Sequence, residues 1–123
     1  MAEERSLESW ITAFSPRFEA LYAFAKSPLP VDVGERQVDI ERAIHLGDEC
    51  GRLLADCKSY LTQHTAQAVL SVKTTYDKLN ADERKMLVKD AVRKIQRLVD
   101  GLEITERAIK ERVYVHMNAN RRL

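Results

Sequence analysis

Two cysteines and a histidine recur at seven-residue intervals in this chain, at Cys50, Cys57 and His64. These residue types bind zinc, and one face of a helix would align all three. Residues seven apart lie about 10.5 Å apart along a helix axis, whereas zinc holds its ligands about 2.0–2.3 Å away. The same separation excludes a disulfide within the helix. We therefore predict buried thiols, no metal and no cofactor, with a site shared between subunits as the alternative.

Arg112 and His116 form a second candidate pair near the C-terminus. They resemble the arginine–histidine motif of the all-helical HEPN ribonucleases, but their spacing is shorter and Val113 replaces the polar residue that usually follows the arginine. We interpret His116 as an ordinary residue near a fraying helix end. The chain also lacks a nucleophile elbow, a glycine-rich phosphate loop and a His-Glu-x-x-His motif. The sequence thus predicts no catalytic residue, no enzymatic activity and no small-molecule substrate.

The clearest functional signal is a basic stripe made of Lys85, Lys89, Arg93, Arg97 and Arg107. On a helix these positions form a slowly turning row opposite the apolar face, with Tyr114 alongside. Between Arg84 and Arg97 six basic residues accompany one acid, Asp90. Such a stripe suits the phosphates of a single-stranded nucleic acid, with Tyr114 and the guanidinium planes stacking on bases. The competing interpretation is a solvated face that pairs with the acidic first part of the chain.

Charge is distributed unevenly along the chain. Residues 82–123 carry eleven Lys and Arg and seven Asp and Glu, whereas residues 1–81 carry nine and twelve. The formal net charge is only +1, so no global field attracts a polyanion. No segment resembles a signal peptide or a membrane-spanning run of apolar residues. We expect an intracellular, cytoplasmic protein that does not contact membranes.

The helix that would carry the basic stripe spans residues 81–120. Its apolar residues recur three and four apart, as on one face of a helix, at Val88, Ala91, Val92, Ile95, Leu98, Val99, Leu102, Ile109 and Val113. Asn80 followed by Glu83 forms a capping box at its start. The helix would be about 58 Å long, and a chain of 123 residues cannot bury such a rod on every side.

A second long helix is predicted over residues 33–79. Its apolar seam alternates steps of three and four, as in a coiled coil, through Ile40, Ala43, Gly47, Cys50, Leu54, Cys57, Leu61, His64 and Ala68. A flanking row of Leu46, Leu53 and Tyr60 widens this face. The small residues Ala43 and Gly47 allow another backbone to approach closely. The pattern weakens near residues 62–66, where the helix either breaks or continues.

The N-terminal region, residues 6–26, also has helical spacing and holds most of the aromatic residues. Pro16 interrupts it, so the helix either restarts with Ser15 as its N-cap or bends. Prolines make residues 27–32 an extended linker. We interpret the aromatic side chains as a lid over a hydrophobic groove, with a stacking platform for ligands or bases as the alternative.

Together these elements predict one all-α domain over residues 1–123. Two long antiparallel helices form a hairpin, and the shorter aromatic-rich helix packs on it. The residues expected in the core or at helix interfaces are Trp10, Phe14, Phe18, Ile40, Gly47, Leu54, Leu61, Ile95, Leu98, Leu102 and Ile109.

The C-terminal half carries one family resemblance. The segments Leu98-Val99-Asp100, Arg107-Ala108-Ile109-Lys110-Glu111-Arg112 and Arg121-Arg122 resemble the end of the UvsY-type phage recombination mediators. Members of that family are small, helical, oligomeric proteins that bind single-stranded DNA and help to load a recombinase. The resemblance implies that Lys110 and Arg112 contact DNA.

Three functions remain open at this point. The first is a non-enzymatic assembly or adaptor protein that self-associates or binds a protein partner through its helix faces. The second is an oligomeric mediator that binds single-stranded nucleic acid with the basic stripe, Lys110, Arg112 and Tyr114. The third is a small helical inhibitor or chaperone of another protein. An elongated hairpin buries little apolar surface by itself, so we expect a homo-oligomer or a protein partner.

Overall fold

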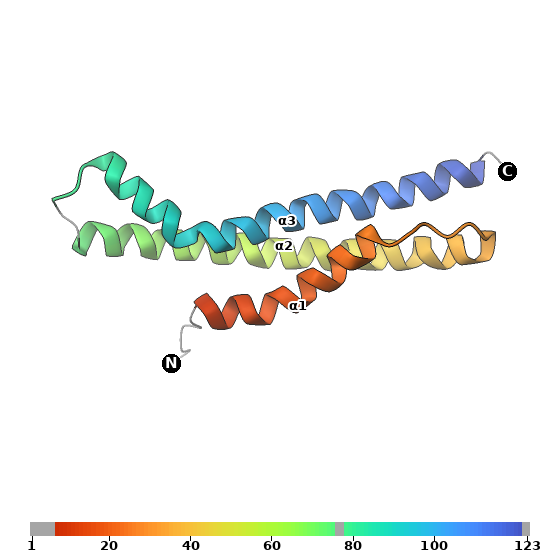
Figure 1. The fold of residues 1–123 in the computed structure, drawn as a ribbon, viewed down its shortest axis with the longest axis horizontal. Coiled ribbons are helices and arrows are strands. Elements are labelled where there is room, and N and C mark those ends of the chain that lie inside the picture. Colours follow the sequence, from red (N-terminus) through yellow and green to blue (C-terminus); the bar gives the residue numbers. More distant parts are fainter. Residues whose placement is uncertain (1–6, 76–77, 122–123) are drawn as a thin grey trace.

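The computed structural model describes residues 7–75 and 78–121, which form three helices. α1 covers Leu7–Lys26, α2 covers Val33–Thr75 and α3 covers Ala81–Arg121. The two long helices pack antiparallel, and α1 lies along them in the direction opposite to α2 (Figure 1). This arrangement confirms the predicted all-α hairpin with a shorter helix packed on it.

Both long helices begin at a side-chain cap, and the cap at Asn80 was predicted from the sequence. Asp32 Oδ2 accepts a hydrogen bond from the Glu35 N–H at 3.2 Å, and Asn80 Oδ1 accepts one from the Glu83 N–H at 2.8 Å. The predicted end of α2 at residue 79 is wrong, because the helix ends at Thr75 and residues 78–80 are not helical. Residue 6 of the predicted first helix, residues 76–77 of the predicted second helix and Arg122 lie outside the described residues.

Neither α1 nor α2 is interrupted where the sequence left a break open. α1 is a single helix with Pro16 inside it, and Figure 1 shows α1 bending along its length, as expected where proline removes an interior hydrogen bond. α2 continues through residues 62–66. There the hydroxyls of Thr62 and Thr65 donate to the carbonyls four residues earlier, at 3.0 and 2.7 Å. These bonds satisfy the polar side chains within the helix.

The hydrophobic core is a strip along the middle of the hairpin that α1 closes. Its buried members are Trp10, Leu21, Phe24, Ala43, Cys50, Leu53, Leu54, Cys57, Ile95, Val99, Leu102 and Ile109. Among the other residues expected there, Gly47 is buried, whereas Phe14, Phe18, Leu61 and Leu98 are half-buried and pack against the strip. Ile40 is half-buried but lies outside this cluster, so the core ends nearer the middle of α2 than we predicted.

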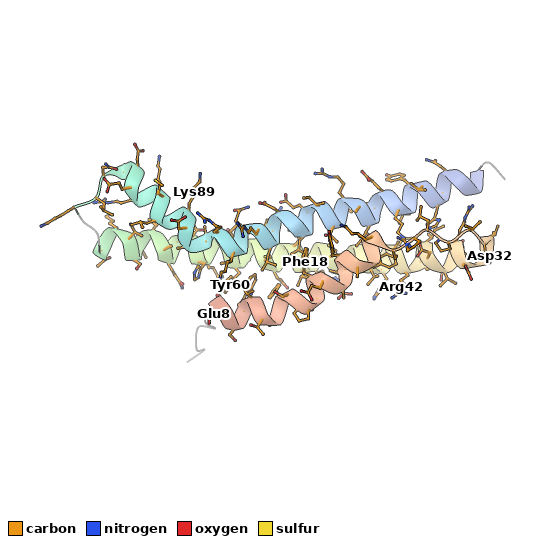
Figure 2. All side chains as sticks on the ribbon, viewed as in Figure 1. Glu8, Phe18, Asp32, Arg42, Tyr60 and Lys89 are labelled. Carbon is orange, nitrogen blue, oxygen red and sulfur yellow. The ribbon has the colours of Figure 1, made fainter. Side chains whose placement is uncertain are left out.

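Aromatic stacking attaches the first turns of α1 to α2. The ring of Trp10 lies parallel to that of Tyr60 with 4.2 Å between centroids, and Phe14 packs 4.0 Å from Trp10. The ring of His64 also stacks with Tyr60, at 5.7 Å between centroids. Figure 2 shows Tyr60 beside the start of α1. The aromatic residues of α1 thus cover the hairpin, as the interpretation of a lid predicts.

Two glycines allow a matched test of how closely α1 packs. A Cβ atom at Gly101 would lie 2.9 Å from Phe18 Cζ, and one at Gly51 would lie 2.9 Å from Glu106 Oε2. Alanine raises helix propensity by about 1 kcal/mol at both sites. The Glu106 carboxylate can swing away, whereas the Phe18 ring is rigid and overpacking costs about 1–3 kcal/mol.

We therefore expect Gly51→Ala to be neutral or stabilising and Gly101→Ala to lower the free energy of unfolding by up to about 2 kcal/mol, which is the overpacking cost less the gain in helix propensity. Urea denaturation followed by circular dichroism measures both values. Equal stabilisation by the two substitutions would show that α1 does not pack against Gly101 as described.

Candidate functional site

An ionic cluster inside the protein joins all three helices. Arg112 on α3 donates from Nε and Nη2 to the two carboxylate oxygens of Asp39 on α2, at 2.7 and 3.0 Å. Its remaining donors reach the backbone carbonyls of Phe24, Ser27 and Pro28, at 3.2, 2.7 and 3.2 Å. All five guanidinium N–H groups therefore have partners. Arg112 thus links the C-terminal end of α1 to the hairpin through hydrogen bonds.

His116 completes this cluster from one turn further along α3. Its Nε2 lies 2.6 Å from Asp39 Oδ2, where the proton on Nε2 is donated to the carboxylate. Burial by itself raises the pKa of Asp39, but the hydrogen bonds from Arg112 and His116 and the positive charge of Arg112 outweigh burial and hold this pKa below its ordinary value. The carboxylate is thus kept ionised in the interior.

This cluster corrects two sequence interpretations. Arg112 was expected to contact DNA, but its side chain is buried and occupied by internal partners, so we remove it from the candidate nucleic-acid residues. His116 was expected near a fraying end, yet it is 2% exposed. Asp39 was missed. Its burial could have been predicted from the flanking row of α2 (Leu46, Leu53 and Tyr60), because Asp39 precedes Leu46 by the same seven residues that separate the members of that row.

The candidate zinc residues do not converge. Cys50 and Cys57 are buried free thiols, and burial raises the pKa of each to about 11. The Cys50 thiol donates to the Leu102 carbonyl at 3.6 Å, while His64 stacks on Tyr60. Within the described residues no group of three His, Cys, Asp or Glu side chains is placed to hold a metal ion. These thiols are expected to be weak nucleophiles.

The basic stripe is exposed along its whole length, but its charge is not continuous. Lys85, Lys89, Arg93, Arg97 and Arg107 are all exposed, as are Lys110 and Tyr114. Arg93 pairs with Asp90 on its own helix. Lys110 Nζ lies 3.5 Å from Glu106 Oε1, and Arg107 shares a groove with Glu103, Glu106 and Glu111. The basic character is therefore concentrated in the first half of α3, before residue 98.

A shallow apolar groove lies between the start of α2 and the end of α3. We call it the Tyr114 groove; its volume is about 410 Å³, and it is lined by Ala43, Ile44, Gly47, Asp48, Lys110, Val113, Tyr114 and Met117. Ala43 and Gly47 are buried at its base, where a Cβ atom on Gly47 would lie 3.5 Å from Ile109 Cγ2. Ile44, Tyr114 and Met117 are 54%, 68% and 44% exposed. An apolar surface gathered in this way is typical of a protein–protein contact.

Two adjoining grooves occupy the other end of the hairpin, and together we call them the tip groove. Figure 1 shows the first turns of α3 sloping toward α2 before the two helices run side by side. The grooves lie between these turns and the last part of α2, and they share Lys85 and Val88. Their other lining residues are Leu61, Thr65, Val69, Val72, Lys73, Arg84, Met86, Lys89, Val92 and Gln96.

No family model, curated protein or solved structure matches this chain, so its function is argued from these surfaces. In the described part of the chain, no helix combines the length and the apolar character needed to cross a membrane.

Proposed function

We propose that this protein is a non-enzymatic helical assembly module that forms a two-fold homodimer through the Tyr114 groove. The observation that carries this proposal is the exposure of Ile44, Tyr114 and Met117 beside the hollow at Gly47. Tyrosine supplies a large contact area at a small cost in conformational entropy. The Tyr114 ring of one chain can enter the hollow over Ala43 and Gly47 of the other, in the manner of a knob in a hole.

The charges of the groove favour a second copy as its occupant. Asp48 lines the α2 side and Lys110 lines the α3 side. In a two-fold contact the same patch meets itself, so each Asp48 can face the Lys110 of the other chain. A groove that selects an acidic or a basic partner would carry charges of one sign. This groove carries both, and they are placed on opposite walls.

Self-association would also compensate for the small size of the hydrophobic core. α1 closes the middle of the hairpin, but the long helices continue beyond it at both ends (Figure 1). Small domains bury too little apolar surface to be very stable alone, and symmetric pairing is the usual remedy. A homodimer through the Tyr114 groove covers apolar side chains that α1 leaves exposed.

Light scattering coupled to gel filtration tests this proposal with two substitutions on α3. The wild-type chain is expected at twice its 14.1 kDa mass. Tyr114→Glu places two charges in the contact and should give the monomer. Ile104→Glu is the matched control, because Ile104 is equally exposed on α3 but does not line the groove; it should remain dimeric. A wild-type monomer at high micromolar concentration would contradict the proposal.

The other functions predicted from the sequence retain less support. An adaptor, inhibitor or chaperone that bound a different protein through the Tyr114 groove would leave the opposite charges of Asp48 and Lys110 without a role. Nucleic-acid binding as in the UvsY-type mediators now depends on the first half of α3, because Arg112 is buried and Arg107 and Lys110 lie among glutamates.

A further inference from the structure

The tip groove has an aliphatic floor. Leu61, Val69 and Val72 contribute from α2, and Val88 and Val92 contribute from α3. Met86 stands at its edge, 68% exposed, and methionine adapts readily to the shape of a bound surface. Because the start of α3 diverges from α2 (Figure 1), these side chains line an open groove instead of closing against each other. The floor is suited to the apolar side chains of a third helix.

Every charged residue that lines the tip groove is basic. Lys73 lies on the α2 side, and Arg84, Lys85 and Lys89 lie on the α3 side. Lys89 occupies the stretch of α3 that slopes toward α2 (Figure 2). Lys85 and Lys89 are exposed and make no ion pair with other described residues. The rim thus selects acidic groups, in contrast to the mixed charges of the Tyr114 groove.

The floor also distinguishes a peptide from a nucleic acid. Proteins that bind single strands without sequence preference stack the bases on aromatic rings. None of the described residues that line the tip groove is aromatic. Aliphatic floors with charged rims are instead typical of grooves that receive an amphipathic helix.

We propose that the tip groove binds an amphipathic helical segment of a protein partner, in which apolar anchors are flanked by aspartate or glutamate. On α2 the groove extends from Leu61 to Lys73, which corresponds to about 18 Å, or about three helical turns. Anchors at positions i, i+3, i+4 and i+7 would rest on the valines and Leu61. The acidic residues beside them would meet Lys73, Lys85 and Lys89. This site is separate from the Tyr114 groove and does not depend on dimerisation.

The probe for this proposal is a fluorescently labelled synthetic helix with leucine at those four positions and glutamate elsewhere. A second peptide keeps the leucines and replaces the glutamates with lysine. Fluorescence anisotropy is expected to show micromolar binding of the acidic peptide and none of the basic one. In an isotope-labelled chain, the amide resonances that shift on binding should include those of Val69, Val72 and Val88.

Two doubly substituted chains with the same change in charge locate the site. Lys85→Glu with Lys89→Glu reverses the rim and should weaken binding at least about tenfold. Lys94→Glu with Arg97→Glu changes exposed residues of the same helix that do not line the groove, and binding should change less than about twofold. Circular dichroism verifies that both chains are folded.

Three results would overturn the proposal. One is the absence of peptide binding at low salt. Another is an equal loss in both doubly substituted chains, which would indicate general attraction to the basic half of α3. The third is tighter binding of oligothymidylate than of the acidic peptide, with affinity falling linearly against the logarithm of salt concentration. That result would support the hypothesis that the basic stripe binds single-stranded nucleic acid.

Discussion

The Arg112→Met substitution is expected to lower the free energy of unfolding by about 3–5 kcal/mol. It leaves the buried carboxylate of Asp39 without its bidentate partner, and it removes the donors to the carbonyls of Phe24, Ser27 and Pro28. Methionine fills a similar volume, so the loss reflects uncompensated polar groups more than a cavity. The end of α1 should detach before the hairpin unfolds.

Arg107→Met is the matched control for this substitution. Arg107 is an exposed arginine on the same helix, and its replacement should change stability by less than about 0.5 kcal/mol. Urea denaturation followed by circular dichroism gives both values. A loss of less than about 1 kcal/mol at Arg112 would mean that the cluster with Asp39 is not formed as described.

The dependence on pH provides a second check of the same cluster. The pKa of Asp39 is lowered in the folded protein, so its contribution to stability is present above the unfolded pKa of about 3.9 and is lost as pH falls through the folded pKa. In the Arg112→Met chain the buried carboxyl lacks the hydrogen bonds and the charge of Arg112, which lower its pKa, and keeps only those of His116. The difference in stability between the two chains should therefore be largest near neutral pH and should shrink in acid.

The Leu102→Ala substitution is the second change with a large expected effect. Leu102 is fully buried between the helices, and truncating a buried leucine costs about 2–5 kcal/mol because it leaves a cavity. The long helices lie firmly against each other there, so the cavity cannot collapse easily. Ile104→Ala, two residues along and exposed, should cost less than about 0.5 kcal/mol.

Thermal and urea denaturation of these two chains compare the buried and exposed faces of α3 directly. Trp10 is the single tryptophan of the chain and is buried against Tyr60. Its fluorescence therefore reports the docking of α1, while circular dichroism reports the helices. Equal losses at Leu102 and Ile104 would contradict the assigned packing of the hairpin.

The hairpin was predictable because apolar spacing determines which face of a long helix is buried. The seam of α2 and the stripe of α3 both follow steps of three and four, and the caps at Asp32 and Asn80 mark where each helix begins. The end of α2 at Thr75 was less predictable, since Val72 continues the apolar pattern into the turn. α2 also continues past the point where the pattern weakens, and there the hydroxyls of Thr62 and Thr65 bond to carbonyls within the helix.

The ionic cluster was harder to predict because the residue types of Arg112 and His116 and their positions around the helix indicate different faces. Arg112 and His116 continue the steps of three and four that pass through Leu102, Thr105 and Ile109, so their positions belong to the buried face. Their polar side chains instead favour the exposed face. They can be buried only because α2 supplies the carboxylate of Asp39 as their partner. Sequence spacing along one helix does not show which residue of another helix lies opposite.

The two grooves depend on how the helices meet and were not visible in the sequence. The Tyr114 groove requires the small buried residue Gly47 on α2 to lie beside the exposed ring of Tyr114 on α3. The tip groove requires α3 to slope toward α2 (Figure 1). The sequence did identify Lys85 and Lys89 as members of an exposed basic stripe, but it did not place them at the rim of an apolar groove.

The molar mass of two charge-reversed chains, measured separately and then mixed, tests the proposed homodimer most directly. Asp48→Lys and Lys110→Asp each place like charges across the two-fold contact, so each chain alone should be a monomer of about 14.1 kDa. In an equimolar mixture every Asp48–Lys110 position again pairs opposite charges, and the mass should double. A mixture that remains monomeric while the wild type is dimeric would contradict the contact, and a monomeric wild type would contradict self-association itself.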